Sequence, residues 1–301
     1  MGLGCGGHSR LGMARGATKE TASQIVREAL DLGVTFVDTA EAYGTEEAVG
    51  LGIRGLPRER VVLSTKVGLD GPPVDAAELR EHLEGSLRRL GTEYVDVYHL
   101  HGILPGQYAH ARDVLHPAML ELKAEGKLRH IGVTEQFIPD PGHRMLREAI
   151  QSELWEVVMV GFSLLNPSAR ERVLSITQER GVGTLDMFAV RHALSNPDAL
   201  KALVSRLIEE GKIDGEGIDR ENPLGFVGPD LQDAAYRFCL HEPGIDVVLS
   251  GTGNAEHLRQ NARSLSGPPL PEDVQSRLKA IFGGIDSITG NEGVPRFGNK
   301  P

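Results

Sequence analysis

The sequence has few of the features that mark secreted, membrane or nucleic-acid-binding proteins. Only Cys5 and Cys239 are cysteines among its 301 residues, so we expect no disulfide framework and a reducing, cytoplasmic setting. No apolar run approaches the roughly 20 residues that span a bilayer, and the N-terminus lacks the basic start and apolar core of a signal peptide. The formal net charge is −10, which nucleic acids and acidic membranes do not attract. We therefore expect neither as a partner.

Linkers are also missing, because no proline- or serine-rich stretch divides the chain, and this predicts one domain over residues 1–301. Short β-branched runs alternate with amphipathic helical stretches along most of the sequence. Eight such runs separated by helices are typical of a single α/β domain of the closed parallel (β/α)₈ or TIM-barrel class. The predicted strands lie near the start of the chain and at 34–38, 60–66, 94–101, 128–134, 156–162, 182–188 and 245–251.

Two segments interrupt this alternation. The long connection 190–229 follows the seventh strand and contains a helical stretch around 198–211; loops of this length are usually functional or disordered. We interpret Arg191 and His192, at its start, as solvated loop residues, although they could meet an anionic group. After the eighth strand, PEDVQSRLKAIFGG predicts a C-terminal helical extension, and NEGVPRFGNKP a flexible tail.

The start of the chain, GLGCGG, matches the G-x-G-x-x-G pattern of dinucleotide-binding loops. That loop must follow a strand and open a helix, whereas only Met1 precedes Gly2. We therefore assign these glycines to the first barrel strand and the turn after it. Because the chain begins almost at this strand, the bottom of the barrel is either covered by the C-terminal segment or left open.

Four polar side chains stand where barrel strands are predicted to end, the face on which TIM-barrel enzymes place their catalytic groups. Asp38 ends the second strand, Tyr43 follows it, Lys66 closes the third and His101 the fourth. Burying Asp38 or Lys66 alone is costly, so the two should form a pair. A neighbouring lysine lowers the pKa of a tyrosine by stabilising the phenolate, which predicts that Tyr43 acts as a general acid. His101 could donate a hydrogen bond to the same substrate oxygen.

These residues resemble the conserved pattern of the aldo-keto reductase family, along nearly the whole chain. The elements are DTAEAY, the lysine of LSTK, the histidine of DVYHLH, the segment GKLRHIGVT and the loop GTGNAEHLRQN, all in order. The resemblance implies that Tyr43 donates the proton, that Lys66 and Asp38 tune it, and that His101 orients the substrate. It also implies that a bound nicotinamide supplies hydride, a chemistry that the protein only positions.

Each residue of this set has a simpler interpretation by itself. Asp38 could cap a turn, Lys66 could extend from a strand end to water, and His101 could be a hydrogen-bonded core histidine. The H-x-H pattern formed by His99 and His101 suggests a metal-dependent hydrolase instead, but this needs further ligands at later strand ends. Asp186 is the one candidate there, so we expect no metal site and place His99 beside His101 as a pocket neighbour.

The predicted nicotinamide site departs from the family pattern. Thr134 and Glu135 stand where the family usually has Ser-Asn to hold the carboxamide, and Glu135 either accepts from the carboxamide NH₂ or faces the substrate. Met159 stands where a glutamine often contacts the same group. Met187, with Phe188 next to it, stands where an aromatic ring often stacks on the nicotinamide; a thioether packs there less specifically.

The predicted phosphate site lacks the basic residue that NADPH-preferring relatives commonly carry after the eighth strand. We expect Gly251, Thr252, Gly253, Asn254 and His257 to hold phosphate, mainly through backbone N–H groups at a helix start. Asn254 is also the expected N-cap of that helix. The adenine contacts are expected from Gln260 and Asn261, with Arg259 turned away from His257. Family habit favours NADPH, and NADH is an open alternative.

The leading hypothesis is an NAD(P)(H)-dependent oxidoreductase that reduces an aldehyde or ketone. The same four residues would serve an aldose or sugar dehydrogenase working in the oxidative direction. A third alternative is a cofactor-binding regulatory protein with little turnover. The expected partner is a small carbonyl or sugar molecule, and the sequence indicates neither its identity nor the oligomeric state.

Overall fold

The computed structural model describes residues 1–69, 71 and 73–292. Eight parallel strands close into one barrel in the order β1-β2-β3-β4-β5-β6-β7-β8, which confirms the predicted fold class. The short first strand, in the GLGC stretch, pairs with both β2 and β8 and thereby closes the ring. The strands are β1 (Gly2–Gly4), β2 (Phe36–Asp38), β3 (Val62–Gly68), β4 (Val95–Ile103), β5 (Leu128–Glu135), β6 (Val157–Gly161), β7 (Gly183–Met187) and β8 (Val247–Ser250).

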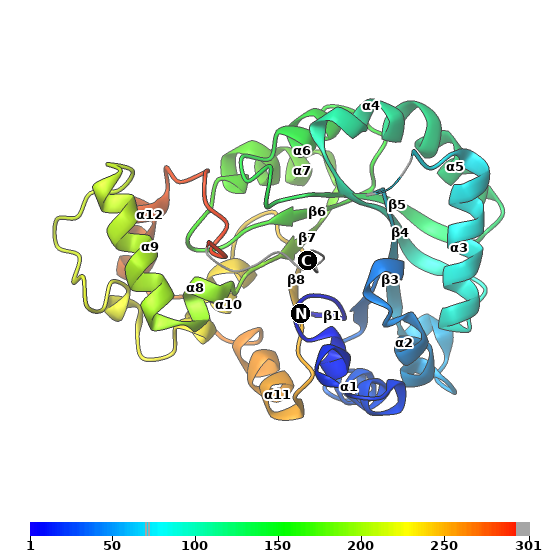
Figure 1. The fold of residues 1–301 in the computed structure, drawn as a ribbon, viewed down its shortest axis with the longest axis horizontal. Coiled ribbons are helices and arrows are strands. Elements are labelled where there is room, and N and C mark those ends of the chain that lie inside the picture. Colours follow the sequence, from blue (N-terminus) through cyan, green and yellow to red (C-terminus); the bar gives the residue numbers. More distant parts are fainter. Residues whose placement is uncertain (70, 72, 293–301) are drawn as a thin grey trace.

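Helices surround the barrel, and a lobe that includes α9 extends to one side of it (Figure 1). The helices are α1 (Lys19–Asp31), α2 (Glu46–Ile53), α3 (Ala76–Leu90), α4 (Tyr108–His110), α5 (His116–Ala124), α6 (Arg144–Ala149), α7 (Ser175–Arg180), α8 (His192–Ser195), α9 (Pro197–Glu209), α10 (Leu231–Leu240), α11 (Ala255–Ser264) and α12 (Glu272–Phe282). Short 3₁₀ turns and two π-helical segments, Ala111–Leu115 and Arg170–Leu174, complete the connections.

Local sequence signals set several helix ends. Helix α3 begins with a capping box in which Asp75 accepts from the backbone of Ala77 and Glu78, while the Glu78 carboxylate accepts from Asp75 N. It ends at Gly91, whose φ of 66° lies in the left-handed region that other residues rarely adopt. Because α3 ends at Gly91, only a short loop separates it from β4.

The two irregular segments form the predicted helices. Helix α9 lies within the 190–229 connection, and α12 forms the predicted C-terminal extension. They belong to one lobe, since Arg277 of α12 donates to Gly217 O at 2.7 Å and its guanidinium lies 4.1 Å from the centroid of the Phe226 ring. The predicted flexible tail lies, from residue 293 onward, outside the described residues.

The segment after α12 packs on the loops at the carboxyl ends of the strands. Asn166 Nδ2 donates to Ile288 O at 2.8 Å, and Ala193 N donates to Gly290 O at 2.9 Å. Asn166 follows β6 and Ala193 follows β7, so this segment lies at the mouth of the barrel. Covering of the barrel bottom by the C-terminal segment, one of the two alternatives above, is therefore wrong for the part described.

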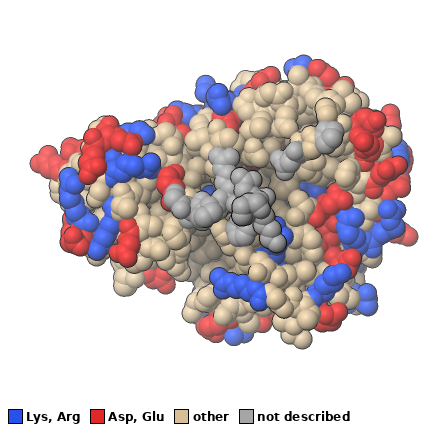
Figure 2. Space-filling model, viewed as in Figure 1, with Lys and Arg blue, Asp and Glu red and all other residues tan. Residues whose placement is uncertain are grey.

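The surface carries both signs of charge. Lysine and arginine alternate with aspartate and glutamate around the rim of the visible face, and both gather on the lobe at the left (Figure 2). Among the residues that the structure describes, no helix has both the length and the apolar character needed to cross a membrane.

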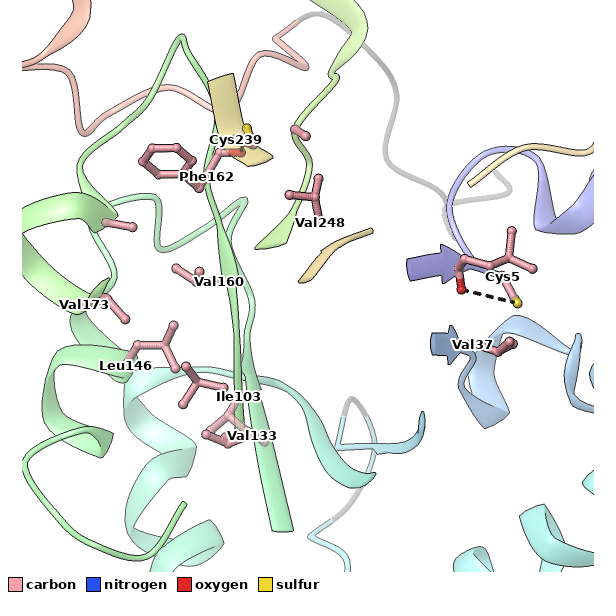
Figure 3. Packing of buried hydrophobic residues seen from close by; sticks show 14 of the residues in the cluster. Cys5, Val37, Ile103, Val133, Leu146, Val160, Phe162, Val173, Cys239 and Val248 are labelled. Atoms are coloured by element: carbon pink, nitrogen blue, oxygen red, sulfur yellow. Dashed lines mark hydrogen bonds between the residues drawn. The ribbon is translucent and has the colours of Figure 1, made fainter. Parts of the chain in front are cut away.

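The core lies between the outer face of the strands and the helices. Val37, Val133 and Val160 belong to this layer and are fully buried (Figure 3). Cys5 and Cys239 are free thiols in separate parts of it, donating to the carbonyls of Leu3 and Phe162 respectively. Because side chains alternate between the two faces of a strand, the neighbours of these core residues point into the barrel.

Candidate active site

Asp38 and Lys66 form a buried ion pair at the carboxyl ends of β2 and β3. Lys66 Nζ donates to Asp38 Oδ2 at 2.6 Å and to Thr39 O at 2.7 Å, while Ser64 Oγ donates to Asp38 Oδ1 at 2.7 Å. Lys66 is 0% exposed and Asp38 3%. Burial disfavours the ammonium form, but the charge and hydrogen bond of Asp38 oppose it and the pKa of Lys66 is raised. Lys66 therefore remains charged, as the sequence predicts for a paired lysine.

Tyr43 reaches this pair from a 3₁₀ turn, Glu41–Tyr43, that directly follows β2. The turn ends at Gly44, which has a φ of 69°. On the other side of the ring lies Gly6, where a Cβ atom would come within 2.5 Å of Tyr43 Cε2. One glycine of the GLGCGG stretch is thus required by close packing against a tyrosine, and the assignment of the stretch to β1 and its turn is confirmed.

The phenol of Tyr43 lies between Lys66 and His101. Its hydroxyl is 3.2 Å from His101 Nε2, the two rings meet edge-on at 85° with centroids 5.4 Å apart, and Lys66 Nζ is 5.1 Å from the centroid of the phenol ring. The four predicted residues therefore converge at one place.

The electrostatics differ from the prediction in one respect. Burial raises the pKa of Tyr43, and the opposing effect of Lys66 does not overcome it. The predicted lowering of the Tyr43 pKa is thus wrong. The loss of hydration on burial destabilises the phenolate by more than the positive charge of Lys66 stabilises it. Burial, with Lys66 nearby, also lowers the pKa of His101 to about 3. At neutral pH the site holds a neutral phenol, a neutral imidazole and an ammonium group.

Three predicted cofactor residues face the inside of the barrel on the opposite strands. Thr134 pairs in register with Met159, and Met187 pairs with Gly161, two residues further along β6. Residues paired in register share a face, so Thr134, Met159 and Met187 all point inward. Thr134 Oγ1 accepts from Gly102 N at 2.7 Å, which leaves its hydroxyl hydrogen available to an acceptor. Phe188 follows with a φ of 79°, rare for a residue with a Cβ.

Glu135 points the other way, toward the helices. Both carboxylate oxygens lie 2.9–3.0 Å from His143 Nδ1, and Gly161 N donates to Oε1 at 2.8 Å. The side chain has no exposure. The prediction that Glu135 meets the carboxamide or the substrate is therefore wrong in this geometry: on a strand whose Thr134 points inward, the next residue points outward, and its carboxylate is fully engaged there.

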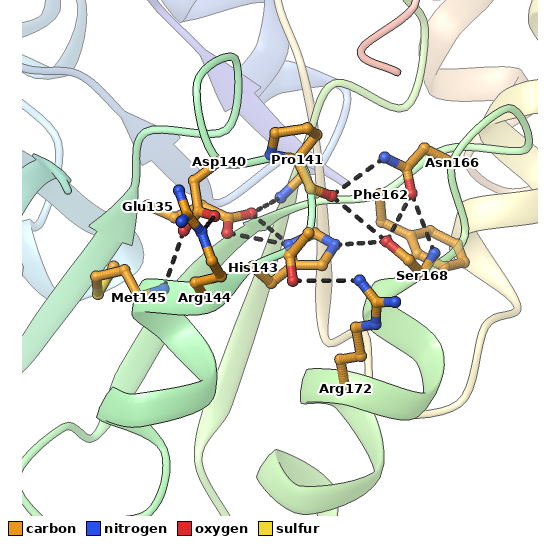
Figure 4. Close-up of polar contacts among 12 residues, drawn as sticks. Glu135, Asp140, Pro141, His143, Arg144, Met145, Phe162, Asn166, Ser168 and Arg172 are labelled. Carbon is orange, nitrogen blue, oxygen red and sulfur yellow. Dashed lines mark hydrogen bonds and ion pairs between the residues drawn. The ribbon is translucent and has the colours of Figure 1, made fainter. Parts of the chain in front are cut away.

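The network around Glu135 was not predicted from the sequence. His143 Nε2 is 3.0 Å from Ser168 Oγ, and Ser168 Oγ donates to Asn166 Oδ1 at 2.6 Å (Figure 4). Asn166 continues the chain to Ile288 O, so the network links the loops after β5 and β6 to the C-terminal segment. His143, Asn166 and Ser168 lie in loops, which have no periodic pattern of residues. Their spacing along the sequence therefore does not indicate that they meet.

The turn between β8 and α11 has the predicted form. Asn254 Oδ1 accepts from Glu256 N at 2.8 Å and His257 N at 3.2 Å, which confirms it as the N-cap. A Cβ atom on Gly251 would lie 2.6 Å from Gly4 O, and one on Gly253 would lie 2.3 Å from Gly12 N. Both glycines are thus required by packing against β1 and its loop. Their backbone still lies beside an exposed helix start.

The side chains on α11 divide into two groups. His257 and Gln260 are exposed and can reach a ligand at the helix start. Arg259 pairs with Glu28 and Glu256, which confirms that it is turned away. Asn261 Nδ2 donates to Ser250 Oγ at 2.8 Å, so Asn261 faces β8. Its amide nitrogen is thus engaged within the protein, although His257, one helix turn earlier, lies on the same side of α11, and the contact of Asn261 with adenine stays a prediction.

The two other candidates for a metal site do not face each other. His99 is fully buried inside the barrel, where Gly132 leaves room for its ring, since a Cβ atom there would lie 2.2 Å from His99 Nδ1. Asp186 is on the outer face of β7, where it accepts from Phe162 N, and burial raises its pKa well above the usual range. Within the described ranges, no three His, Cys, Asp or Glu side chains gather as a metal site would require.

Arg191 is the clearest departure from the predicted solvated loop. It is only 7% exposed, and its guanidinium carbon lies 3.8 Å from the centroid of the Phe188 ring. An arginine buried directly after a barrel strand has the position of a functional residue. The one signal in the sequence is Phe188, three positions before Arg191. By itself it does not show whether the arginine stacks on the aromatic ring or extends into water.

Comparison with known proteins gives one consistent result. The model of the aldo/keto reductase family matches residues 2–199. The chain is 38% identical over 314 residues to L-galactose dehydrogenase of Arabidopsis thaliana, covering 96% of this chain and 92% of the relative. It is 27% identical over 298 residues to aldo-keto reductase YhdN of Bacillus subtilis, covering 89% and 85%.

Solved structures agree with this relationship. The aldo-keto reductase of Klebsiella pneumoniae in complex with NADPH superimposes with a TM-score of 0.65 and 26% identity, over 96% of this chain and 93% of that chain. The holo form of aldo-keto reductase AKR11C1 from Bacillus halodurans gives a TM-score of 0.69 and 25% identity, over 93% and 90%.

Proposed function

This chain belongs to the aldo/keto reductase family, and we propose from its site that it transfers hydride between NADPH and the carbonyl carbon of a small aldehyde or ketone, with Tyr43 as the proton donor. The observation that supports the proposal is the convergence of Tyr43, Lys66, Asp38 and His101 at the mouth of the barrel.

The charges of these residues suit a general acid. A raised pKa keeps Tyr43 protonated before the reaction, so the phenol has a proton to give. Once the proton leaves, Lys66 is the nearby cation that stabilises the phenolate, and Asp38 holds Lys66 in place. His101 is neutral and beside the Tyr43 hydroxyl, where it can hydrogen-bond to a carbonyl oxygen without competing as an acid.

The residues around this site fit a nicotinamide cofactor. Thr134, Met159 and Met187 offer a hydroxyl and two thioethers on the inner face, suited to a carboxamide and a flat ring. The turn before α11 offers phosphate the exposed imidazole of His257 and the backbone N–H groups of Gly253 and Ala255, since those of Glu256 and His257 are donated to the Asn254 cap. NADPH, when bound, supplies the hydride. The same exposed histidine is the group we assign to the 2′-phosphate that distinguishes NADPH from NADH.

A second candidate is oxidation of an aldose by NADP⁺ or NAD⁺. It is favoured by the 38% identity to a plant L-galactose dehydrogenase, against 27% to YhdN. The same residues serve both directions, because a phenol that donates a proton in reduction accepts one, as phenolate, in oxidation. The substrate would then be a sugar hemiacetal in place of an aldehyde.

The experiment compares wild type with Tyr43→Phe, using Tyr94→Phe as the matched control, since Tyr94 lies just before β4, between Arg58 and Arg129 and away from the site. Affinities for NADPH and NADH are measured through the fluorescence of the cofactor, since Trp155 precedes β6 and lies at the far end of the barrel from the site. Rates are then measured with aldehydes in reduction and with aldoses in oxidation.

We expect Tyr43→Phe to bind NADPH as wild type does and to lose about 10²–10⁴ in kcat, the range that general acid catalysis contributes. Tyr94→Phe should retain both the NADPH affinity and the kcat of wild type. A Tyr43→Phe variant with full activity would refute the assigned proton donor. Wild type that binds cofactor but turns over neither substrate class would instead favour the regulatory alternative.

A further inference from the structure

Arg191 carries hydrogen-bond donors that nothing in the described part of the chain accepts. Its Nε and Nη2 atoms are buried and have no hydrogen-bond partner there, and the residue is only 7% exposed. An arginine normally satisfies its five donors or keeps them in water, because an unmet buried donor costs free energy. A buried guanidinium with unused donors is suited to bind a ligand that supplies hydrogen-bond acceptors.

The guanidinium is also held in one position. It stacks on the ring of Phe188, at 3.8 Å from the centroid, and Phe188 keeps a backbone φ of 79° that places its ring there. The base of the side chain packs on Gly290, where a Cβ atom would come within 2.9 Å of Arg191 Cβ. Only a glycine leaves room for this arginine, so both neighbours fix the side chain before any ligand arrives.

The charges near Arg191 leave it without a counterion at contact distance. Arg191 forms no ion pair with a described residue, although Glu292, whose Oε2 is also buried without a hydrogen-bond partner, is close enough to favour the charged form. Glu292 uses Oε1 to accept from Thr289 N at 2.6 Å. Burial, followed by the nearby Arg191 and His192, lowers the pKa of His8. Burial lowers the pKa of Arg191 to about 10, so it remains a cation at neutral pH.

These groups surround the barrel mouth. Phe188 directly follows Met187, which points into the barrel, and His8 belongs to the loop after β1. Arg191 and His8 are close enough, in the loops after β7 and β1, to interact electrostatically. Because its lowered pKa keeps His8 neutral at neutral pH, Arg191 is the cation of this pair at the entrance.

We propose that Arg191 is a receptor for an oxyanion at the mouth of the barrel, a carboxylate or a phosphate. We assign it to a carboxylate of the substrate, which makes the preferred substrates carbonyl compounds that also carry an acid group; this assignment rests on the proposed function. The fork of Nε and Nη2 matches the two oxygens of a carboxylate, the geometry in which arginine binds most strongly. A phosphate of the cofactor offers the same chemistry from a second source.

The first test does not depend on catalysis. Melting temperatures of wild type, Arg191→Met, Arg191→Lys and Arg112→Met are measured against inorganic phosphate and acetate at constant ionic strength. Arg112 is an exposed arginine paired with Asp113, so its variant removes the same charge elsewhere. We expect wild type and Arg112→Met to gain about 3 °C at an anion concentration about ten times Kd.

Arg191→Met should show no such gain, and Arg191→Lys a smaller one, because an ammonium group lacks the fork. Without added anion, Arg191→Met should melt no lower than wild type, since it removes a buried charge that has no partner. Equal anion responses in wild type and Arg191→Met, or a large loss of stability in anion-free buffer, would overturn the proposal and make Arg191 a structural residue.

The second test identifies the source of the anion. We compare kcat/KM for two aldehydes that differ only in a carboxylate against a carboxamide, and we measure NADPH affinity separately by cofactor fluorescence. Wild type should prefer the acid, and Arg191→Met should reduce this preference by about 10- to 100-fold, the range of a charge-assisted hydrogen bond. Unchanged preference with weaker NADPH binding would assign the anion to the cofactor. If wild type bound no NADPH, the proposed function would be refuted. The phosphate titration would then still decide whether Arg191 binds an anion.

Discussion

Replacing Lys66 by methionine tests the most tightly coupled contact in the site. The ammonium group is fully buried and donates both to Asp38 Oδ2, at 2.6 Å, and to Thr39 O, at 2.7 Å. Methionine fills the space but leaves the Asp38 carboxylate buried with Ser64 as its remaining donor. Removing one partner of a buried ion pair typically costs about 3–5 kcal/mol, because the other charge is left without compensation. We expect a loss of this size, well above that of an average substitution.

Urea unfolding of three variants measures this loss. With a slope of about 3 kcal/mol per M, Lys66→Met and Asp38→Asn should each lower the midpoint by about 1–2 M. The double variant contains two neutral groups and should lose less free energy than the sum of the single variants, because neither buried charge is then unpaired. If each single variant lost less than about 1 kcal/mol, or if their losses were additive, the described pair would not hold the site together.

The pH dependence of Lys66→Met gives an independent check. Burial raises the pKa of Asp38, and Lys66 is the main group that opposes it in wild type. In the variant the folded pKa of Asp38 therefore lies above its unfolded value. Such a group stabilises the folded state below the unfolded pKa, and this stability is lost as pH rises through the folded pKa. The defect of Lys66→Met should consequently be larger at pH 8 than at pH 5.

Two further substitutions test the surrounding groups. The pKa of His101 is about 3 in the folded protein, so the unfolded chain binds more protons between pH 3 and 6.5 and stability falls as pH decreases through that window. His101→Gln should remove up to about 2 kcal/mol of this loss at pH 5. If the urea midpoint of the variant followed the same pH profile as wild type, the lowered pKa of His101 would be contradicted. Glu135→Gln should cost about 1–3 kcal/mol, because a Gln side chain replaces the negative charge and places an NH₂ group where Oε2 now lies 3.0 Å from His143 Nδ1. NADPH affinity should remain unchanged in Glu135→Gln, and weaker binding at full thermal stability would restore the predicted cofactor contact.

The barrel and its catalytic residues could be predicted because their signals repeat or lie at fixed places. Alternation of β-branched and helical runs gave the eight strands, with boundaries within a few residues of those observed: 128–134 became Leu128–Glu135 and 182–188 became Gly183–Met187. Asp38 and Lys66 were found because a charge at the end of a buried strand needs a partner, and His101 because it closes the next strand.

The direction of single side chains was harder to predict. Glu135 is one position beyond Thr134, and that single step moves a side chain from the inner face to the outer one. Alignment with a family pattern matches residue positions, but it does not say whether a carboxylate in place of an amide keeps the same direction. His143 captures this carboxylate from a loop whose path the sequence does not specify.

Glycines show why a pattern match and a contact are different kinds of evidence. The glycines of GLGCGG and GTGN invite assignment to phosphate binding, yet in this protein Gly6 makes room for the Tyr43 ring and Gly253 for the backbone of Gly12. The same reasoning applies to Gly290, which leaves room for Arg191. A glycine in a sequence indicates either a left-handed φ, as at Gly91, or a close approach, and the structure must say which and by what. Here the approaching groups are the proposed proton donor and the proposed anion receptor, so glycines distant in sequence support both halves of the site.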